Sequence, residues 1–207
     1  MSFTLPKLYP ITDARASGLS HAEQVLRLTR GGARLIQLRE KHLDAREFFR
    51  EAEAAISLTR EPGVRLIIND RVDIALATGA DGVHLGQDDL PPEAARRILG
   101  ERAVIGFSTH NVEQAMAAAS LPIDYLAIGP IFPTSSKENP DPTIGLDGLR
   151  RVRDAVPSLP LVAIGGITLE NALETYAAGA DSLAVIGSLL ADPPQIEARV
   201  RDWITRF

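Results

Sequence analysis

The fold is decided by one stretch, which starts with Leu66-Ile67-Ile68-Asn69-Asp70 and ends with Gly82-Val83-His84-Leu85-Gly86-Gln87-Asp88-Asp89. Each part is a short apolar run that stops at polar or acidic residues, which is typical of a buried strand. Between them, an apolar segment from Val72 to Leu76 followed by Gly79 predicts a short helix. A strand–helix–strand unit holds its strands in parallel, so both end at the same rim of a sheet.

Asp70 and Asp89 follow these two strands and are therefore expected to meet at that rim. Two carboxylates at one rim repel each other unless a proton or a cation lies between them. Oxygen ligands with room for water and a substrate phosphate suit Mg²⁺. The alternative is that each aspartate only caps the helix after it. Capping is the preferred interpretation for either residue alone, whereas the pair favours a magnesium site.

The same alternation of strand and helix recurs along the chain. The predicted strands cover residues 8–12, 34–39, 66–68, 82–86, 104–108, 125–129, 161–164 and 182–186. The predicted helices begin near Ser20, Asp44, Val72, Pro91, Asn111, Leu146, Thr168 and Pro193, with Gly63 closing the second and Gly179 the seventh. The one long irregular stretch, residues 130–143, has the length of a functional loop.

Eight strands alternating with eight helices predict an α/β fold of the (β/α)8 TIM-barrel type, as a single catalytic domain over residues 1–207. The alternative is an open, doubly wound sheet. The absence of a G-x-G-x-x-G motif before the first helix counts against that alternative.

The composition excludes several classes of protein. A net charge of −5 argues against a general nucleic-acid or membrane surface, and the absence of cysteine excludes disulfides and thiolate metal sites. The N-terminus lacks a signal-peptide pattern, and no apolar run has the length of a membrane span. We therefore expect a cytoplasmic protein with small-molecule substrates and with neither nucleic-acid nor membrane partners. Whether it forms a homo-oligomer is left open.

Active-site residues of this fold lie where the strands end. Gln37 and Arg39 alternate on one face of the second strand, and Lys41 follows them. A solvated charged loop is the simpler interpretation of residues 39–41 taken alone. Together with Lys137, however, these cations would lie beside the aspartate pair, which is how proteins hold and discharge a pyrophosphate.

The turns after the last two strands suggest a second anion site. Gly165-Gly166 and Ile186-Gly187 stand where backbone N–H groups of such barrels often hold phosphate. The alternative for the glycine pair is a tight turn and nothing more.

The histidines give weaker signals. His21 and His42 are predicted to be solvated, and His84 to be a packed core residue. His110 is expected to cap a helix rather than to transfer a proton, and Ser108 has no apparent base other than His110.

An ordered set of motifs resembles thiamine phosphate synthase over nearly the whole chain. The motifs are Gln37-Leu38-Arg39-Glu40-Lys41, Ile68-Asn69-Asp70, His84 to Asp89, Gly106 to His110, Gly129 to Lys137 and Ala163 to Ile167. The resemblance implies a transferase that joins the pyrophosphate of a hydroxymethylpyrimidine to a thiazole phosphate, using Mg²⁺ and releasing pyrophosphate.

The resemblance also implies roles for individual residues. Those matching the pyrimidine pyrophosphate site are Gln37, Arg39, Lys41, Asn69, Ser108 and Lys137, of which Arg39, Lys41, Ser108 and Lys137 are expected to be catalytic. Those matching the thiazole phosphate site are Thr134, Ser135, Ser136, Gly166, Ile186 and Gly187. Asp70 and Asp89 match the metal ligands. Ser136 replaces a common threonine, and Gly187 replaces a common serine, whose hydroxyl Ser188 is a candidate to supply.

Three other functions remain as alternatives. A thiazole tautomerase of the same superfamily would lack the aspartate pair. A phosphosugar isomerase would need a well-placed base instead of a metal site. A thiamine-phosphate-binding regulator would have lost Lys41, Lys137 or an aspartate, and all of these are present.

Overall fold

All strands lie in one parallel sheet in the computed structural model, which describes residues 3–60, 63–134 and 141–207. The strands are β1 (Leu8–Pro10), β2 (Leu35–Leu38), β3 (Arg65–Asn69), β4 (Gly82–Leu85), β5 (Val104–Thr109), β6 (Tyr125–Ile128), β7 (Leu161–Ile164) and β8 (Ser182–Val185). They pair in the order β1-β8-β7-β6-β5-β4-β3-β2. A parallel bridge between Ile11 and Gln37 then joins the two ends of this order. The sheet closes into a barrel, so the predicted (β/α)8 fold is confirmed and the open sheet is excluded.

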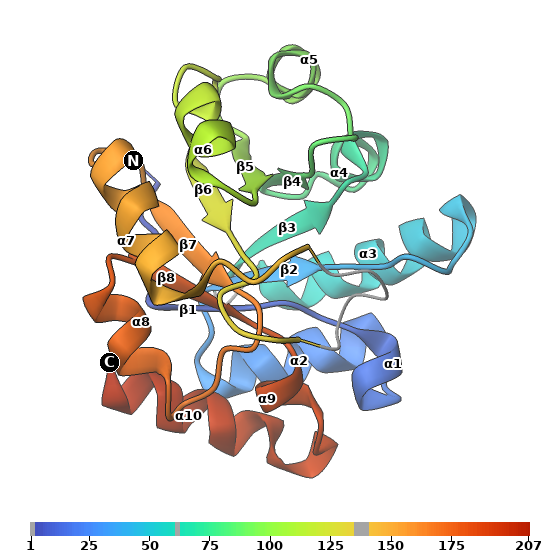
Figure 1. Cartoon of the computed structure of the whole chain (residues 1–207). Helices are drawn as coiled ribbons and strands as arrows, with labels where there is room; N and C mark the ends of the chain where they lie inside the picture. Colours follow the sequence, from blue (N-terminus) through green and yellow to red (C-terminus); the bar gives the residue numbers. More distant parts are fainter. Residues whose placement is uncertain (1–2, 61–62, 135–140) are drawn as a thin grey trace.

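Helices surround the barrel in chain order, from α2 and α3 through α4, α5 and α6 to α7, α8 and α10 (Figure 1). The helices are α1 (Ala14–Ser17), α2 (His21–Gly31), α3 (Ala45–Thr59), α4 (Val72–Thr78), α5 (Pro92–Leu99), α6 (Val112–Ala118), α7 (Gly145–Ala155), α8 (Ala172–Ala177), α9 (Gly187–Leu190) and α10 (Ile196–Arg206), with a 3-10 turn at Pro193–Gln195. Within the described ranges, none of them combines the length and the apolar character that crossing a bilayer requires.

Three predicted helix starts are confirmed by their caps. The Ser20 hydroxyl accepts the Glu23 N–H at the start of α2, and Asn111 accepts the Gln114 N–H at the start of α6. Asp44 forms a complete capping box with Glu47 at the start of α3. These signals could be read locally, because each cap side chain accepts the backbone N–H of the residue three positions further on.

Other helix boundaries were predicted wrongly. The helix expected to begin at Thr168 begins at Ala172, because the Thr168 N–H donates to Asn171 Oδ1 at 2.8 Å and forms a turn instead. The helix expected to reach Gly63 ends at Thr59. The sequence also missed α1 and α9, since helices of four residues are too short to show a hydrophobic period.

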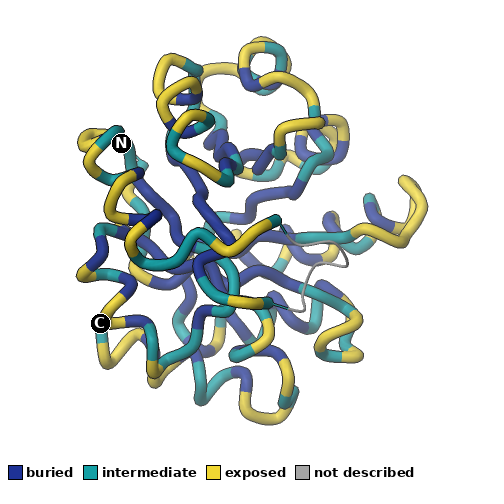
Figure 2. Tube along the Cα trace, viewed as in Figure 1, coloured by how far each residue is buried: buried dark blue, intermediate teal, exposed yellow. Residues whose placement is uncertain are grey.

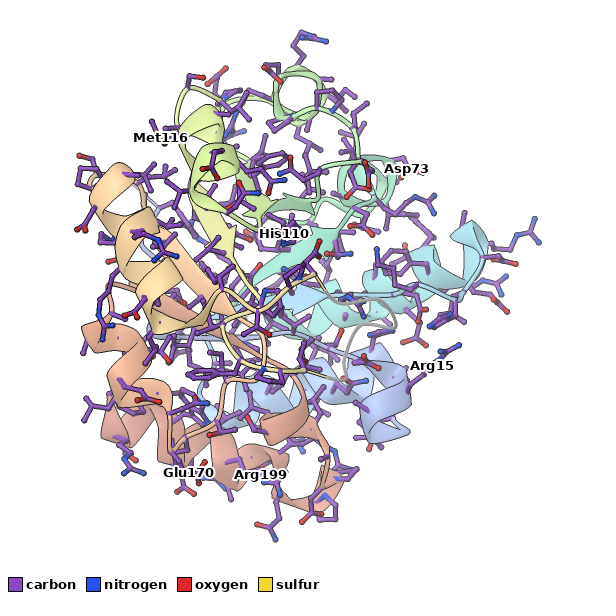
Figure 3. The ribbon with its side chains drawn as sticks, viewed as in Figure 1. Arg15, Asp73, His110, Met116, Glu170 and Arg199 are labelled. Carbon is purple, nitrogen blue, oxygen red and sulfur yellow. The ribbon has the colours of Figure 1, made fainter. Side chains whose placement is uncertain are left out.

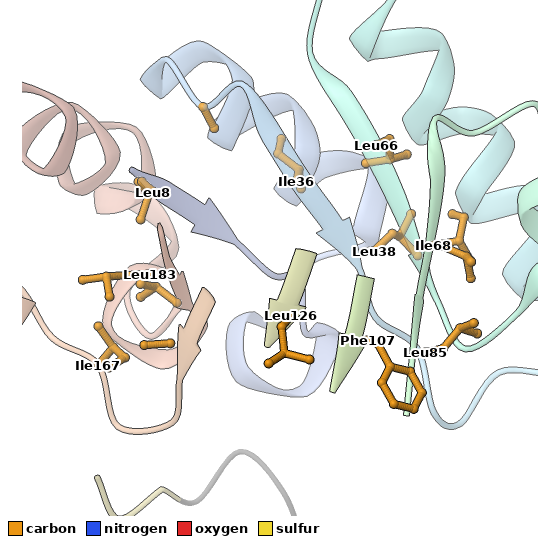
Figure 4. Packing of buried hydrophobic residues seen from close by; sticks show 14 of the residues in the cluster. Leu8, Ile36, Leu38, Leu66, Ile68, Leu85, Phe107, Leu126, Ile167 and Leu183 are labelled. Carbon is orange, nitrogen blue, oxygen red and sulfur yellow. The ribbon is translucent and has the colours of Figure 1, made fainter. Parts of the chain in front are cut away.

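The apolar residues form two cores, separated by the wall of the barrel. The larger core lies between strands and helices and includes Leu38, Ile68 and Leu126 (Figure 4). The smaller core fills the inside of the barrel and includes Tyr9, Ile67 and Tyr125. Figure 2 shows the strands buried and the outer turns exposed. Burying each large side chain contributes about 1.5–3 kcal/mol, so the wall is rigid and the strand ends are held in place.

Candidate active site

A cavity of about 810 Å³ opens where the strands end. The predicted site residues that line it are Gln37, Arg39, Lys41, Asn69, Asp70, Asp89, Ser108, Thr134, Gly166, Ile186 and Gly187. Ser135, Ser136 and Lys137 lie outside the described residues. The structure therefore brings together every predicted site residue that it describes.

Asp70 and Asp89 do not act as helix caps. The cap positions of α4 and α5 are Arg71 and Pro91, and neither helix has a side-chain cap bond. Asp89 instead accepts the Gly86 N–H at 2.7 Å, within its own turn. The capping alternative is wrong for both residues, which leaves the two carboxylates directed to the cavity.

The backbone of Asp70 is strained. Its φ of 64° makes it the one non-glycine residue with a left-handed backbone in the described parts of the chain. Its N–H donates to His84 O at 2.8 Å, and the Arg71 N–H donates to Asn69 O at 2.8 Å across it, which closes a tight turn. Such a backbone costs about 1–3 kcal/mol and occurs mostly where function requires a fixed side-chain position.

The negative charge of Asp70 acts on Asp89. Burial raises the pKa of Asp89, and the neighbouring charge of Asp70 raises it further, against the Gly86 N–H and Lys41, which lower it. Lys41 Nζ contacts Asp70 Oδ2 directly. The carboxylates thus share a place where added positive charge is favourable. Two carboxylate oxygens facing a polar cavity suit a hard divalent cation with bound water, so these residues fit Mg²⁺. No group of three or more metal-binding side chains occurs among the residues that the structure describes.

The loop that carries Arg39 and Lys41 is held in place by Glu40, although Lys41 itself is exposed. Glu40 turns inward, where its Oε2 accepts a hydrogen bond from His21 Nε2 at 2.8 Å. Its Oε1 accepts the backbone N–H of Lys41 at 2.7 Å and that of Leu43 at 3.1 Å. His21 is only 1% exposed, so the prediction that it is solvated was wrong. The sequence could not show this pair, because its members lie on α2 and after β2.

His84 is packed as predicted, but it is also the partner of Ser108. His84 is 7% exposed, and its Nε2 lies 2.8 Å from Ser108 Oγ. The imidazole beside Ser108 is therefore that of His84 and not that of His110. Burial lowers the pKa of His84 to about 4, against the charge of Asp89, which raises it. His84 was missed as a site residue. The available signal was its position on β4, where it points into the barrel as Gln37 does on β2.

His110 does not cap α6 through its side chain. Its Nδ1 donates to Gly129 O at 2.7 Å, and Asn111 provides the cap. In Figure 3, His110 lies near the centre of the molecule, whereas Met116 and Glu170 lie outside the ring of helices. His110 therefore joins the end of β5 to the end of β6 at the rim of the cavity.

The turn after β7 requires glycine because another loop packs against it. Gly166 has a φ of 64°, and a Cβ there would lie 2.6 Å from Pro133 O. At Gly187, by contrast, a Cβ would meet nothing within 4 Å. Gly187 opens the short helix α9, and the Ser188 hydroxyl donates to Ile167 O at 3.0 Å. The two turns thus meet at the cavity, with open space at Gly187.

The chain matches the family model described as thiamine monophosphate synthase over residues 8–189. It belongs to the thiamine monophosphate synthase family. A thiamine-phosphate synthase of Koribacter versatilis is 50% identical, over 92% of each chain. That of Chloroflexus aurantiacus is 48% identical, over 89% of this chain and 85% of its own. The predicted family and transferase class are confirmed.

A solved structure agrees with this assignment. Thiamine phosphate pyrophosphorylase from Pyrococcus furiosus superimposes with a TM-score of 0.85 and 38% identity, over 97% of this chain and 94% of that one. The membership of this family thus rests on sequence and fold together.

Proposed function

We propose that this protein condenses a hydroxymethylpyrimidine pyrophosphate with a thiazole phosphate to give thiamine phosphate and pyrophosphate. The observation that carries the proposal is the meeting of Arg39, Lys41, Asp70 and Asp89 in one cavity of a chain that belongs to this family. Cations beside a carboxylate pair suit a substrate whose leaving group carries several negative charges.

The chemistry requires a good leaving group and no protein nucleophile. The bond from the pyrimidine methylene to the pyrophosphate oxygen breaks, and its electron pair leaves with the pyrophosphate. The amino group of the ring stabilises the cation that remains, and the thiazole nitrogen then supplies the electron pair of the new C–N bond. The protein has to neutralise the leaving group, exclude water and align the two rings.

Arg39, Lys41 and Asn69 are assigned to the pyrophosphate, together with Lys137 outside the described residues. Asp70 and Asp89 would hold Mg²⁺. When bound there, Mg²⁺ supplies charge neutralisation for the departing pyrophosphate. Lys41 contacts Asp70, and so a phosphate oxygen that approached Lys41 would also lie beside the aspartate pair.

The thiazole phosphate is assigned to the opposite side of the mouth. Thr134, Gly166, Ile186 and Gly187 line that side of the cavity. In this fold the turns after β7 and β8 and a short extra helix often hold phosphate, and α9 is such a helix. Ser135 and Ser136 are assigned to the same phosphate from the sequence alone.

The test is incubation of the purified protein with both substrates and Mg²⁺, with detection of thiamine phosphate by mass. Product formation that stops with EDTA supports the proposal. Binding of thiamine phosphate without any turnover would instead indicate the regulator. Conversion of a thiazole phosphate in the absence of the pyrimidine would indicate the tautomerase.

A further inference from the structure

A chain of side-chain hydrogen bonds crosses the inside of the barrel between Gln37 and Ser108. Gln37 Nε2 donates to the Tyr9 hydroxyl at 3.2 Å, and the Tyr9 and Tyr125 hydroxyls lie 2.8 Å apart. The Tyr125 hydroxyl lies 3.0 Å from His84 Nδ1, and His84 Nε2 lies 2.8 Å from Ser108 Oγ. Both ends of the chain reach the cavity, while its middle links β1, β6 and β4.

The middle of this chain is buried, although Tyr9 and His84 also border the cavity. Tyr9 is 1% exposed and Tyr125 is fully buried. The rings of His84 and Tyr125 stack with an interplanar angle of 21°. A Cβ at Gly106 would lie 2.1 Å from the Tyr125 ring and 2.5 Å from His84 Nδ1, so the glycine leaves the room that this stack needs. Buried polar groups without partners cost about 1–3 kcal/mol each, so every hydrogen in the chain needs an acceptor.

When the Gln37 amide N–H donates to Tyr9, only one orientation of the hydrogen bonds along this chain gives every hydrogen an acceptor. The Tyr9 oxygen accepts a hydrogen bond from Gln37. The Tyr9 hydroxyl must then donate to the Tyr125 oxygen, because Tyr125 is its one other partner in the described part of the protein. The Tyr125 hydroxyl in turn donates a hydrogen bond to His84 Nδ1. Because its Nδ1 accepts this hydrogen bond, His84 carries its proton on Nε2, and the Nε2–H group donates a hydrogen bond to Ser108 Oγ.

Burial keeps the Tyr9 and Tyr125 hydroxyls protonated, and this preserves the direction of their hydrogen bonds. It raises the pKa of Tyr9 well above its usual range, although hydrogen bonds to Tyr125 and Gln37 lower it. Burial also raises the pKa of Tyr125, as does Tyr9 beside it. Both phenols therefore remain hydrogen donors at any working pH.

We propose that Tyr9 and Tyr125 are positioning residues that give this chain a single direction. Gln37 then offers its carbonyl oxygen to the cavity, and Ser108 offers its hydroxyl hydrogen. The inference rests on the proposed function, because it assigns Gln37 and Ser108 to the pyrimidine ring. An acceptor and a donor held in these places match an amino group next to a ring nitrogen. A pyrimidine with an oxo group in place of the amino group presents the opposite pattern and is rejected.

The first experiment determines the direction of the hydrogen bonds without any substrate, from the position of the proton on the His84 ring. Nitrogen-15 NMR of histidine-labelled protein separates protonated from unprotonated ring nitrogens, and the spectrum of a His84→Gln variant assigns the His84 signals. We expect the proton on Nε2 and none on Nδ1. A proton on Nδ1, with or without one on Nε2, overturns the proposal whether or not the protein makes thiamine phosphate.

The second experiment measures specificity. Tyr125→Phe removes the central hydroxyl and keeps the ring, so the two halves of the chain are free to turn independently. We expect about a tenfold rise in the KM of the aminopyrimidine substrate, about a tenfold loss of discrimination against its oxo analogue, and an unchanged thiazole KM. The matched control is Tyr176→Phe, which removes a hydroxyl that donates to Lys7 O outside the site. Circular dichroism confirms that each variant is folded.

The outcomes separate the inference from the function on which it rests. If the parent enzyme is inactive when both substrates are supplied, the proposed function is overturned, and the specificity inference with it. An active parent whose Tyr125→Phe variant keeps its discrimination, or changes both KM values equally, overturns the inference alone. If Tyr125→Phe does not fold, Tyr9→Phe carries the same test, because it removes the neighbouring hydroxyl and the partner of Gln37.

Discussion

His21 Nε2 lies 2.8 Å from Glu40 Oε2, in a contact between side chains that are only 1% and 6% exposed. The Thr12 hydroxyl lies 2.7 Å from His21 Nδ1 and also accepts the Arg39 N–H at 3.2 Å. The loop that carries Arg39 and Lys41 is thus anchored to α2 and to Thr12, which follows β1. This anchor has the geometry to set the position of both cations, which leads to the first two predictions.

Glu40→Gln is expected to impair the pyrophosphate side of the site. One amide oxygen cannot replace two carboxylate oxygens, so either His21 or the loop N–H groups lose their acceptor, at a cost of about 1–3 kcal/mol in the free energy of unfolding. We expect a fall of about tenfold to a hundredfold in kcat/KM for the pyrimidine pyrophosphate, because its cations are displaced. Steady-state kinetics and thermal unfolding measure both effects. The exposed Glu53→Gln on α3 is the control, and equal kinetics in the two variants would count against the anchor.

Glu40 is also expected to make stability depend on pH in acid. Burial raises the pKa of Glu40, but the hydrogen bonds from His21 and from the His42 and Leu43 N–H groups outweigh it and hold the pKa at about 2, below the ordinary 4.5. A carboxyl with a lower pKa in the folded state stabilises the fold above its unfolded pKa. That stabilisation is lost as the pH falls from about 4.5 to about 2. The difference in free energy of unfolding between the parent and Glu40→Gln should therefore shrink across this window. A difference that stays constant would contradict the assignment.

Asp70 offers a test of strain against function. Asp70→Ala and Asp70→Gly both remove the carboxylate, so each should lower kcat by ~10²–10³-fold. Glycine adopts the left-handed backbone without the penalty that alanine suffers, so Asp70→Gly should be the more stable by about 1 kcal/mol. Denaturant unfolding and kinetics measure the two effects. Equal stability of the variants would mean that the turn relaxes when the carboxylate is lost.

Turnover is expected to depend on Mg²⁺, and Mg²⁺ binding is expected to require both Asp70 and Asp89. EDTA should abolish turnover of the parent, and added Mg²⁺ should restore it. Asp89→Ala should bind Mg²⁺ more weakly in calorimetry, because one of the two carboxylates that would hold the cation is lost. Asp73→Ala, on the exposed side of α4, is the control for removal of a nearby aspartate. Unchanged Mg²⁺ binding in Asp89→Ala would show that the metal is held elsewhere.

The turns after β7 and β8, at Gly166 and Gly187, should respond differently to an added side chain. Gly187→Ser has open space around its Cβ and should lower the KM of the thiazole phosphate or leave it unchanged. Gly166→Val combines a left-handed backbone with a clash against Pro133 O, so it should raise that KM and also lower the melting temperature. A rise in the pyrimidine KM alone would mean that the two halves of the site are reversed.

The sequence alone determined the order of the elements and the rim at which the site lies. Strand and helix alternation is a local pattern of apolar spacing, and the caps at Ser20, Asp44 and Asn111 depend on residues three positions away. Once the strands are known to be parallel, their ends must share one rim. That is why Asp70, Asp89 and Ser108 could be placed at the cavity from their positions after strands.

Only the tertiary structure decided which of these residues act on one another. Tyr9 and Tyr125 are 116 positions apart, and their hydroxyls meet because the barrel closes and turns both rings inward. His21 was predicted to be solvated since its partner Glu40 belongs to another element. The left-handed turn at Asp70 is held in part by one hydrogen bond, from its N–H to His84 O on the next strand. Local patterns specify which face of an element is apolar, but contacts across the barrel follow from its closure, which no short stretch of sequence contains.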